Sequence, residues 1–478
     1  MLRNAGEWRP PQADPRPTVA IVGGGASGML FAAQLLRAAT IAGTSVRGVL
    51  IERRESLGGV AYSTRDPSHR LNVAACGMSA FPDDPDHFVR WCERRVRASE
   101  RTAYASRADY CRYLGDVLAA TQRRAGPAVS LVRLIAEVTA AEPARDGVRL
   151  ELAGGATIAA NLAVLAIGNL PAARPPGYEA LAAHERFVSD PWSPAALEQI
   201  AAARRGAVLL IGSGLTTVDL ALSLANRRPR ARLIAMSRSG LLPQAHLSGS
   251  GQSTPAPTRV DEHVSFAELV DRVLVEAAAG GARWHQLVDG LRPVTQAHWR
   301  RLSFDERAEF MATRHRAWSV HRHRMAPEVA LRLSELLASG QLELYRGAPE
   351  VTSTAGGGLE LRLPGGERVA LSLAVNCTGP LLDPRASAEP LVRQLLSAQH
   401  VRGHPLGIGF DTAPGGAFRG GDGAPQARLL TLGPPRIGEL YETTAIPEIR
   451  EQARELAVGV VSRLAGERYP LRGRAHTA

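Results

Sequence analysis

Residues 18–28 have the sequence TVAIVGGGASG, and this stretch decides the fold. A short apolar run rich in β-branched residues is followed by glycines with the spacing G-x-G-x-x-G, at Gly23, Gly25 and Gly28. A helical pattern of apolar residues follows over Met29–Ala39, and a second strand is predicted over Gly48–Ile51. Strand, glycine turn, helix and strand together predict a βαβ unit.

Each glycine of this motif has a physical task in a dinucleotide-binding turn. Gly23 allows the tight turn, Gly25 lets the backbone approach a pyrophosphate, and Gly28 lets the helix pack closely on the strand. With Ser27, they lie where a helix amino end presents free N–H groups to phosphate. Glu52 ends the second strand, where a carboxylate can accept hydrogen bonds from ribose hydroxyls. A glycine-rich turn without a ligand is the alternative.

The same pattern returns at residues 207–217, AVLLIGSGLTT, which predict a second dinucleotide-binding unit. Its motif consists of Gly212, Gly214 and Thr217, with a small Thr in place of the third glycine. The next strand ends near Arg238, without a carboxylate. An Arg there suits a 2′-phosphate, whereas an acid would repel it, so NADPH is favoured over NADH. The alternative is that Arg238 is simply a solvated side chain.

Further cofactor-contacting residues are predicted from turns and helix starts. They are Gly58, Gly59, Asn72, Gly168, Gly379, Thr443 and Thr444. Either threonine is suited to cap the helix predicted over Ile446–Leu464. The helix amino end would then favour negative charge on a bound ring. An ordinary surface turn and simple capping are the alternatives.

Composition excludes several classes of protein. The chain has 478 residues and a net charge of +11, and every one of its 57 Lys-or-Arg positions is Arg. Without Lys there is neither a Walker phosphate loop nor a Schiff-base enzyme. The Arg residues are scattered and not gathered with aromatics, so we expect no nucleic-acid partner. The longest apolar runs are too short to span a membrane.

The cysteine pattern and the amino-terminal leader bear on localisation. The four cysteines contain no Cys-x-x-Cys pair, which argues against a zinc site and a dithiol redox centre. Unpaired cysteines suit a reducing compartment, so we expect a cytoplasmic protein. Residues 1–17 are polar and Pro-rich, and we interpret them as a disordered leader and not as a signal peptide.

The predicted organisation is α/β, with two Rossmann-like dinucleotide-binding domains and a helical insertion. The first domain covers residues 18–190 and 370–478, and the second covers 191–369, with the insertion at about 260–340. The insertion contains the sequence HRHR at 321–324. We predict no metal there, because the neighbouring Arg residues repel a cation and no acid or Cys has ligand spacing. Arg322 and His323 are instead catalytic or anion-binding candidates, and the alternative is that this segment is a solvated helix face.

These residues resemble a bacterial family of FAD/NAD(P)-binding monooxygenases that includes a urate hydroxylase and an aspartate N-monooxygenase. The resemblance spans about residues 18–465 and rests on the segments GGGASG, LGGVAY, RLNV, GSGLT and ETTA. It implies an enzyme that binds FAD, oxidises NADPH or NADH, and uses O₂ to form a flavin C4a-hydroperoxide that oxidises a small molecule.

The chain length makes urate hydroxylation to 5-hydroxyisourate our first hypothesis. Urate is an anion, and Arg436 or Arg322 is a candidate to pair with it. The alternatives are N-hydroxylation of an amino acid or amine, a flavin reductase, and a non-catalytic flavin-binding protein. The sequence does not decide the substrate, the catalytic acid or base, or the oligomeric state.

Overall fold

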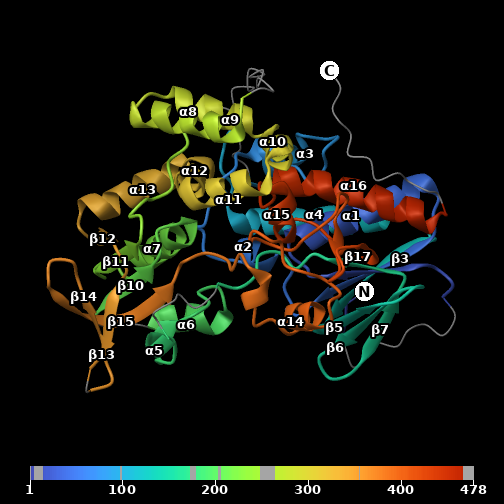
Figure 1. Cartoon of the computed structure of the whole chain (residues 1–478), viewed down its shortest axis with the longest axis horizontal. Helices are drawn as coiled ribbons and strands as arrows, with labels where there is room; N and C mark the ends of the chain where they lie inside the picture. The colour runs from blue at the N-terminus through green and yellow to red at the C-terminus, as the bar shows by residue number, and fades with distance from the viewer. Residues whose placement is uncertain are drawn as a thin grey trace.

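The computed structural model describes residues 2–4, 14–96, 100–172, 179–202, 206–247, 264–354 and 356–466. Two sheets lie at opposite ends of the molecule, and a group of helices lies along the top of the view in Figure 1. The chain runs from the first sheet to the second, passes through these helices, completes the second sheet, and then returns to the first sheet. The predicted α/β fold with two Rossmann-like domains and a helical insertion is confirmed.

The first sheet joins seven strands of the described chain. Its order is β1 (Leu2–Asn4), β4 (Val129–Ile135), β3 (Val46–Glu52), β2 (Thr18–Val22), β8 (Leu162–Leu165), β17 (Pro425–Thr431) and β16 (Ala417–Arg419). Only β16 runs antiparallel to its neighbour. Every residue of β2 is buried, as expected for a central parallel strand covered on both faces.

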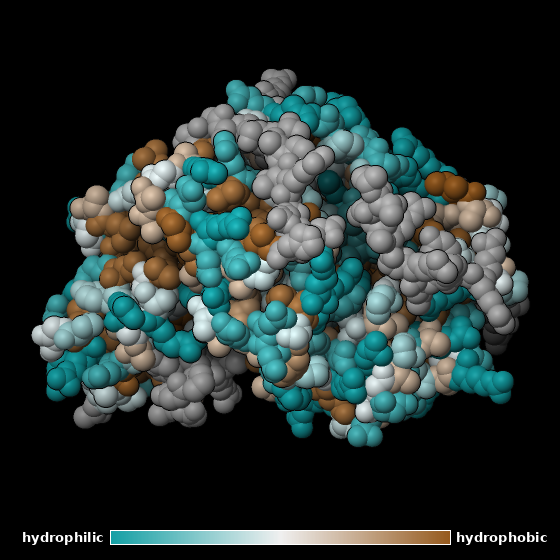
Figure 2. Space-filling model, turned by 45° about the horizontal axis from the view of Figure 1, so that its top comes forward, coloured by the Kyte–Doolittle hydropathy of each residue, from teal (hydrophilic) through white to brown (hydrophobic). Residues whose placement is uncertain are grey.

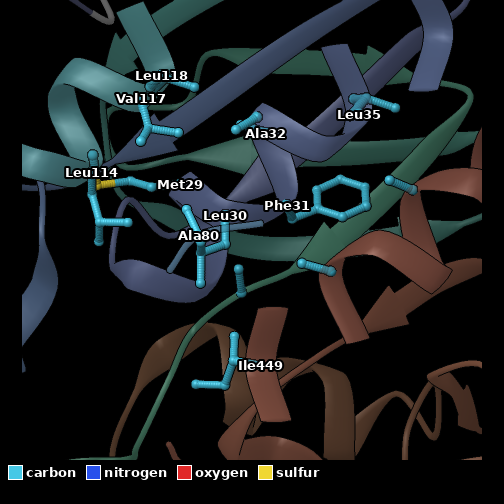
Figure 3. Close-up of a cluster of buried hydrophobic side chains, with 14 of the residues drawn as sticks. Met29, Leu30, Phe31, Ala32, Leu35, Ala80, Leu114, Val117, Leu118 and Ile449 are labelled. Carbon is cyan, nitrogen blue, oxygen red and sulfur yellow. The ribbon is translucent and has the colours of Figure 1, made fainter. Parts of the chain in front are cut away.

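Helices cover one face of this sheet. They are α1 (Ala26–Ala42), α2 (Gly59–Tyr62), α3 (His87–Val96), α4 (Arg107–Arg124) and α16 (Ile446–Leu464). The central helix α1 packs against both α4 and α16. Figure 3 shows this core, in which Phe31 and Leu35 of α1 lie with Leu114 of α4 and Ile449 of α16. The predicted carboxy-terminal helix therefore helps to build the first domain.

A small antiparallel sheet and one helix cover another part of the first sheet. The strands are β5 (Val138–Pro143), β6 (Val148–Leu152) and β7 (Thr157–Ala160), and the helix is α14 (Pro390–Ser397). Apolar residues of these elements form one core with the first sheet. Short 3₁₀ turns, among them η2 (Ala75–Gly77), η3 (Pro384–Ala386) and η4 (Pro434–Arg436), lie in the connecting segments.

The second sheet is built around parallel strands, like the first. Its order is β12 (Leu342–Arg346), β11 (Leu233–Ser237), β10 (Ala207–Ile211), β15 (Arg368–Asn376), β14 (Leu359–Arg362) and β13 (Glu350–Ser353), and β9 (Phe187–Val188) pairs with β15. Its helices are α5 (Glu179–Ala182), α6 (Pro194–Ala202), α7 (Leu215–Arg227) and α13 (Pro327–Ala338). The predicted second glycine unit corresponds to β10, α7 and β11.

The helical insertion lies between β11 and α13. It contains α8 (Phe266–Ala278), α9 (Arg283–Leu291), α10 (Thr295–Arg301), α11 (Phe304–Thr313) and α12 (His315–Arg322). Its aromatic core includes Trp299 and Trp318 and also takes in Ile408 and Tyr441 from the returning chain. A short helix, α15 (Ile437–Leu440), contacts α10. The insertion therefore packs on the first domain although it is inserted in the second.

The structure shifts the predicted domain boundaries. All of β15, up to Asn376, belongs to the second sheet, so the predicted return to the first domain at residue 370 is several residues too early. The second sheet also takes β9, which precedes the predicted start at residue 191. Within the predicted leader, residues 2–4 pair with β4, which corrects the expectation of disorder for these three residues. Residues 1 and 5–13 lie outside the described chain.

Candidate functional site

A cavity of about 440 Å³ begins at the first glycine turn and extends to the second domain. Nine of the predicted cofactor residues line it: Gly23, Gly25, Ser27, Glu52, Gly58, Gly59, Gly168, Gly379 and Thr444. Leu215, Thr216 and Asp219, from the first turns of α7, line the same cavity. The cavity therefore extends from the first glycine turn to the first turns of α7, although Gly212, Gly214 and Thr217 of the second motif do not themselves line it.

The first glycine turn has the geometry that its sequence predicts. Gly23 has φ +108°, and a Cβ there would lie 2.5 Å from the carbonyl oxygen of Ala166. A Cβ on Gly28 would lie 1.9 Å from the carbonyl oxygen of Gly23, so Gly28 serves helix–strand packing and does not line the cavity. Helix α1 has no side-chain cap, which leaves its first N–H groups free for an anion.

A second pair of glycines crosses the first turn. Gly58 donates its N–H to the carbonyl oxygen of Gly24 at 2.9 Å. Gly59 has φ +64°, and a Cβ there would lie 2.9 Å from the Cα of Gly25. Two stretches of backbone therefore meet without side chains between them, at the wall of the cavity. This geometry fits a pyrophosphate held by backbone.

Glu52 and its neighbours form one end of the cavity. One carboxylate oxygen of Glu52 accepts the N–H of Gly24 at 2.6 Å, and the other accepts the N–H of Arg54 at 3.0 Å. These two bonds fix the orientation of the Glu52 carboxylate, and its remaining lone pairs can accept hydrogen bonds from ribose hydroxyls. Nearby, Arg53 pairs with Glu389 at 2.9 Å and with Glu137 at 3.4 Å, and all three residues line the cavity.

The two predicted capping threonines have different roles. Thr443 is fully buried; its hydroxyl donates to the carbonyl oxygen of Gly433 at 2.9 Å and accepts from Gln452 at 2.7 Å. Neither threonine caps α16, which begins after Ala445 without a side-chain cap, so the capping prediction is wrong. Thr443 instead fixes the loop at Gly433, while the exposed Thr444 lines the cavity.

The second glycine turn repeats the design of the first. Gly212 has φ +128°, and a Cβ there would lie 2.3 Å from the carbonyl oxygen of Cys377. Gly214 precedes α7 with open space around its Cα, and α7 has no side-chain cap. Thr217 is buried in the position of the third glycine. Arg238 is exposed just past the end of β11 and forms no ion pair with any described residue.

The end of the cavity between the domains contains residues that the sequence analysis did not predict. Asp219 of α7 accepts from Arg107 of α4 at 2.6 Å, and both side chains are largely buried. The rings of Trp192 and His69 are edge-to-face, with their centroids 5.6 Å apart. Burial raises the pKa of Tyr62 to about 12. Trp192 precedes the second glycine unit in the sequence and Asp219 follows its turn, so closeness to that motif is the sequence feature that could have indicated both residues.

Asn72 does not line the cavity and has a structural contact. Its carbonyl oxygen lies 3.1 Å from Nε2 of His246, a residue of the second domain. Burial, together with the positive charge of Arg324, lowers the pKa of His246 to about 3. The imidazole is therefore neutral and donates from Nε2 to this carbonyl. Asn72 joins the two domains through its backbone.

The three weak catalytic candidates lie outside the cavity. Arg436 is buried and pairs with Glu439 at 2.9 Å. Arg322 is buried between Glu442 at 3.2 Å and Glu448 at 3.4 Å. Burial lowers the pKa of His323 to about 4. None of the three lines this cavity, and the two buried arginines already have carboxylate partners.

Metal binding and membrane insertion have no support among the described residues. No group of three His, Cys, Asp or Glu side chains there is arranged to hold a metal ion. No described helix combines the length and the apolar character needed to cross a bilayer.

On the face in Figure 2, hydrophobic patches are interspersed with hydrophilic surface. The most exposed large apolar residues, Ile41, Val275 and Leu331, belong to three different helices.

Two dinucleotide-type units facing one cavity define the class of fold found in two-domain flavoproteins. The FAD-NAD(P)-binding family profile matches residues 20–170, which contain the first glycine turn, Glu52 and Gly168. The expectation of an FAD- and NAD(P)-binding protein is confirmed at the level of this profile and of the fold. Comparison with curated proteins found no match.

Solved flavin monooxygenases share the whole architecture. The cadaverine monooxygenase DfoA from Erwinia amylovora, bound to FAD, has a TM-score of 0.63 at 13% identity, covering 97% of this chain and 98% of its own. L-lysine 6-monooxygenase from Pseudomonas syringae has a TM-score of 0.61 at 17% identity, covering 94% and 100%. The ornithine N-hydroxylase KtzI from Kutzneria sp. 744, with reduced FAD, NADP⁺ and L-ornithine, has a TM-score of 0.60 at 15% identity, covering 94% and 99%. These likenesses establish the fold, and the predicted enzyme class agrees with them.

Proposed function

We propose that this protein is an FAD-dependent monooxygenase that consumes NADPH and O₂ and N-hydroxylates a small amine. The observation that carries the proposal is the single cavity lined by both the first glycine turn and the first turns of α7. A flavin held at the first turn and a nicotinamide held at the second would meet in that space. Bound FAD would supply hydride acceptance and oxygen activation.

The chain's own residues have positioning roles in this proposal. The uncapped amino end of α1 and the Gly25–Gly59 crossing would bind the FAD pyrophosphate, and Glu52 would bind the ribose. Gly214 and the uncapped start of α7 would bind the NADPH pyrophosphate. Arg238, with no acid beside it, favours the 2′-phosphate of NADPH.

An amine substrate has more support than urate. The structural neighbours named above are described as acting on cadaverine, lysine and ornithine. The interdomain end of the cavity is lined by two carboxylates, Asp190 and Asp219, and one guanidinium, Arg107. An excess of negative charge suits a cationic substrate better than an anion. Urate finds no such support, because Arg436 and Arg322 are buried in ion pairs elsewhere.

The test is substrate-stimulated coenzyme oxidation by the purified protein. It is loaded with FAD, mixed with NADPH, and given ornithine, lysine, cadaverine and urate in separate reactions. We expect an amine to accelerate NADPH oxidation and to gain one oxygen by mass spectrometry. Stimulation by urate alone, with 5-hydroxyisourate as product, would replace the amine with the earlier hypothesis.

Two outcomes would remove the monooxygenase proposal. NADPH oxidation that is equally fast without O₂ and passes electrons to another acceptor would indicate a flavin reductase. FAD that binds but is reduced by neither NADPH nor NADH would indicate a non-catalytic flavin-binding protein. None of the four cysteines forms a disulfide in the described chain and no two have Cys-x-x-Cys spacing, which argues against electron transfer to a disulfide through a dithiol pair.

A further inference from the structure

The helical insertion places one arginine directly on the second glycine turn. Arg316, the second residue of α12, donates from Nη2 to the hydroxyl of Ser213 at 3.0 Å. Its Nε donates to the hydroxyl of Ser239 at 3.1 Å, and Nη2 also lies 3.3 Å from the carbonyl oxygen of Leu241. Ser213 is the middle residue of the Gly-Ser-Gly turn, and Ser239 follows β11. Arg316 therefore bridges the turn and the end of the adjacent strand.

The charge around Arg316 is unbalanced. The side chain is exposed and has no carboxylate partner among the described residues. Burial of part of the side chain and the positive charge of Arg238 lower the pKa of Arg316. By contrast, Arg314 and Arg322, at either end of the same helical segment, pair with acids. Two neighbouring guanidinium groups without an acid make a site for a doubly charged anion.

The location identifies which anion. In a dinucleotide-binding unit the adenosine ribose lies over the end of the second strand, next to the glycine turn. Ser239 and Arg238 occupy that strand end here, and Ser213 occupies the turn. A phosphate on the 2′-hydroxyl of that ribose would therefore lie between Arg238 and Arg316.

We infer that Arg316 and Arg238 together bind the 2′-phosphate of NADPH, so that the helical insertion helps to determine coenzyme preference. The inference rests on the proposed function only in taking the second glycine turn as the NADPH site. The opposite end of α12 is fixed, because Arg322 is held between Glu442 and Glu448. Arg316 is thus presented on an anchored helix, and little ordering is needed when phosphate binds.

Nucleotide fragments test the inference without turnover. Titration calorimetry on the full-length protein would compare adenosine 2′,5′-bisphosphate with adenosine 5′-monophosphate. Wild type should prefer the bisphosphate. Arg316→Gln should weaken bisphosphate binding about tenfold to a hundredfold, the range expected for losing a charge-assisted bond, and leave monophosphate binding unchanged. Arg238→Gln should act in the same direction, and Arg316→Lys should restore part of the preference.

A matched control separates this role from general charge loss. Arg332→Gln removes an exposed arginine of α13 that pairs with Glu335, and it should leave both titrations unchanged. Thermal unfolding of each variant checks the fold. If Arg316→Gln weakens both nucleotides equally, or neither, the inference is wrong. If the bisphosphate preference depends on Arg316 but no amine stimulates NADPH oxidation, the inference stands and the proposed activity fails.

Discussion

The carboxylate of Asp219 lies 2.6 Å from the guanidinium of Arg107, and this ion pair crosses from one dinucleotide-binding domain to the other. Both side chains are largely buried, and both line the cavity. Burial raises the pKa of Asp219, and the positive charge of Arg107 opposes that rise. The pair therefore sets the position of α7 against α4 at the point where the two cofactors are proposed to meet.

Breaking this pair should destabilise the protein. Asp219→Ala leaves Arg107 without its buried partner, for which we expect a loss of about 3 to 5 kcal/mol in the free energy of unfolding. The double variant Arg107→Met/Asp219→Leu, which removes both charges, should lose less than Asp219→Ala alone. Urea denaturation measures both. A single variant within about 0.5 kcal/mol of wild type would show that the pair contributes little.

Two glycine substitutions in the same turn should have different effects. A Cβ on Gly25 meets only the Cα of Gly59, at 3.7 Å, so Gly25→Ala should fold with a loss of about 1 kcal/mol or less while its methyl group blocks the pyrophosphate. We expect FAD affinity, measured by flavin fluorescence, to fall at least about tenfold. Gly28→Ala forces a Cβ against the backbone of Gly23 and should destabilise the fold by about 1 to 3 kcal/mol. Equal FAD affinity in Gly25→Ala and wild type would place the pyrophosphate elsewhere.

Protonation of His246 should make the fold sensitive to acid. Its pKa is lowered from 6.5 to about 3, so the unfolded chain takes up a proton that the folded chain refuses. The stability contribution is therefore intact above pH 6.5 and is lost progressively as pH falls toward 3. The loss approaches about 1.4 kcal/mol per pH unit for one proton. Urea unfolding of wild type and His246→Gln from pH 7.5 to 4.5 should show a shallower decline in the variant; parallel curves would contradict the assignment.

Arg322 should matter for folding and not for cofactor binding. Arg322→Met leaves Glu442 buried without its cation, although Glu448 keeps Arg292 at 2.7 Å. We expect a loss of about 3 to 5 kcal/mol in unfolding free energy. FAD affinity of the remaining folded protein should stay within about twofold of wild type, on the order of 0.4 kcal/mol. A stable variant that binds FAD but loses amine-stimulated turnover would instead indicate that Arg322 contributes to substrate binding.

The local part of the fold could be predicted from sequence because its causes lie within a few residues. Gly23 and Gly212 each need a positive φ next to a close backbone neighbour, and such turns have a recognisable spacing. The apolar repeat of α16 likewise predicts the helix over Ile446–Leu464 that the structure contains. Nine predicted cofactor residues line one cavity, but Gly212 and Gly214 of the second motif, which lies on the other sheet, are not among them.

Roles that depend on distant partners could not be predicted. Arg322 looked like an anion ligand because its carboxylate partner is identified only by tertiary packing; Glu442 lies 120 residues beyond Arg322. Arg436 differs, because its partner Glu439 lies only three residues away; what the sequence does not show is that the Arg436 side chain is buried. The contacts of Arg107 with Asp219 and of Arg316 with Ser213 could not be predicted for the same reason as that of Arg322, because the partners are far apart in the sequence. The domain boundary was misplaced because the apolar run in β15 has no local mark of which sheet it joins.

The order of the strands has a consequence for synthesis on the ribosome. The first sheet begins with the amino-terminal strands, but β17 and α16 emerge only after the entire second domain. A nascent chain that has not yet exposed these elements lacks β17, one of the two strands that pair with β8, and α16, the helix that packs on α1. The second domain can thus complete its own sheet first, whereas the first sheet, which carries the first glycine turn, is complete only when translation is nearly finished. A truncation that removes α16 would therefore expose α1, the helix that follows the first glycine turn.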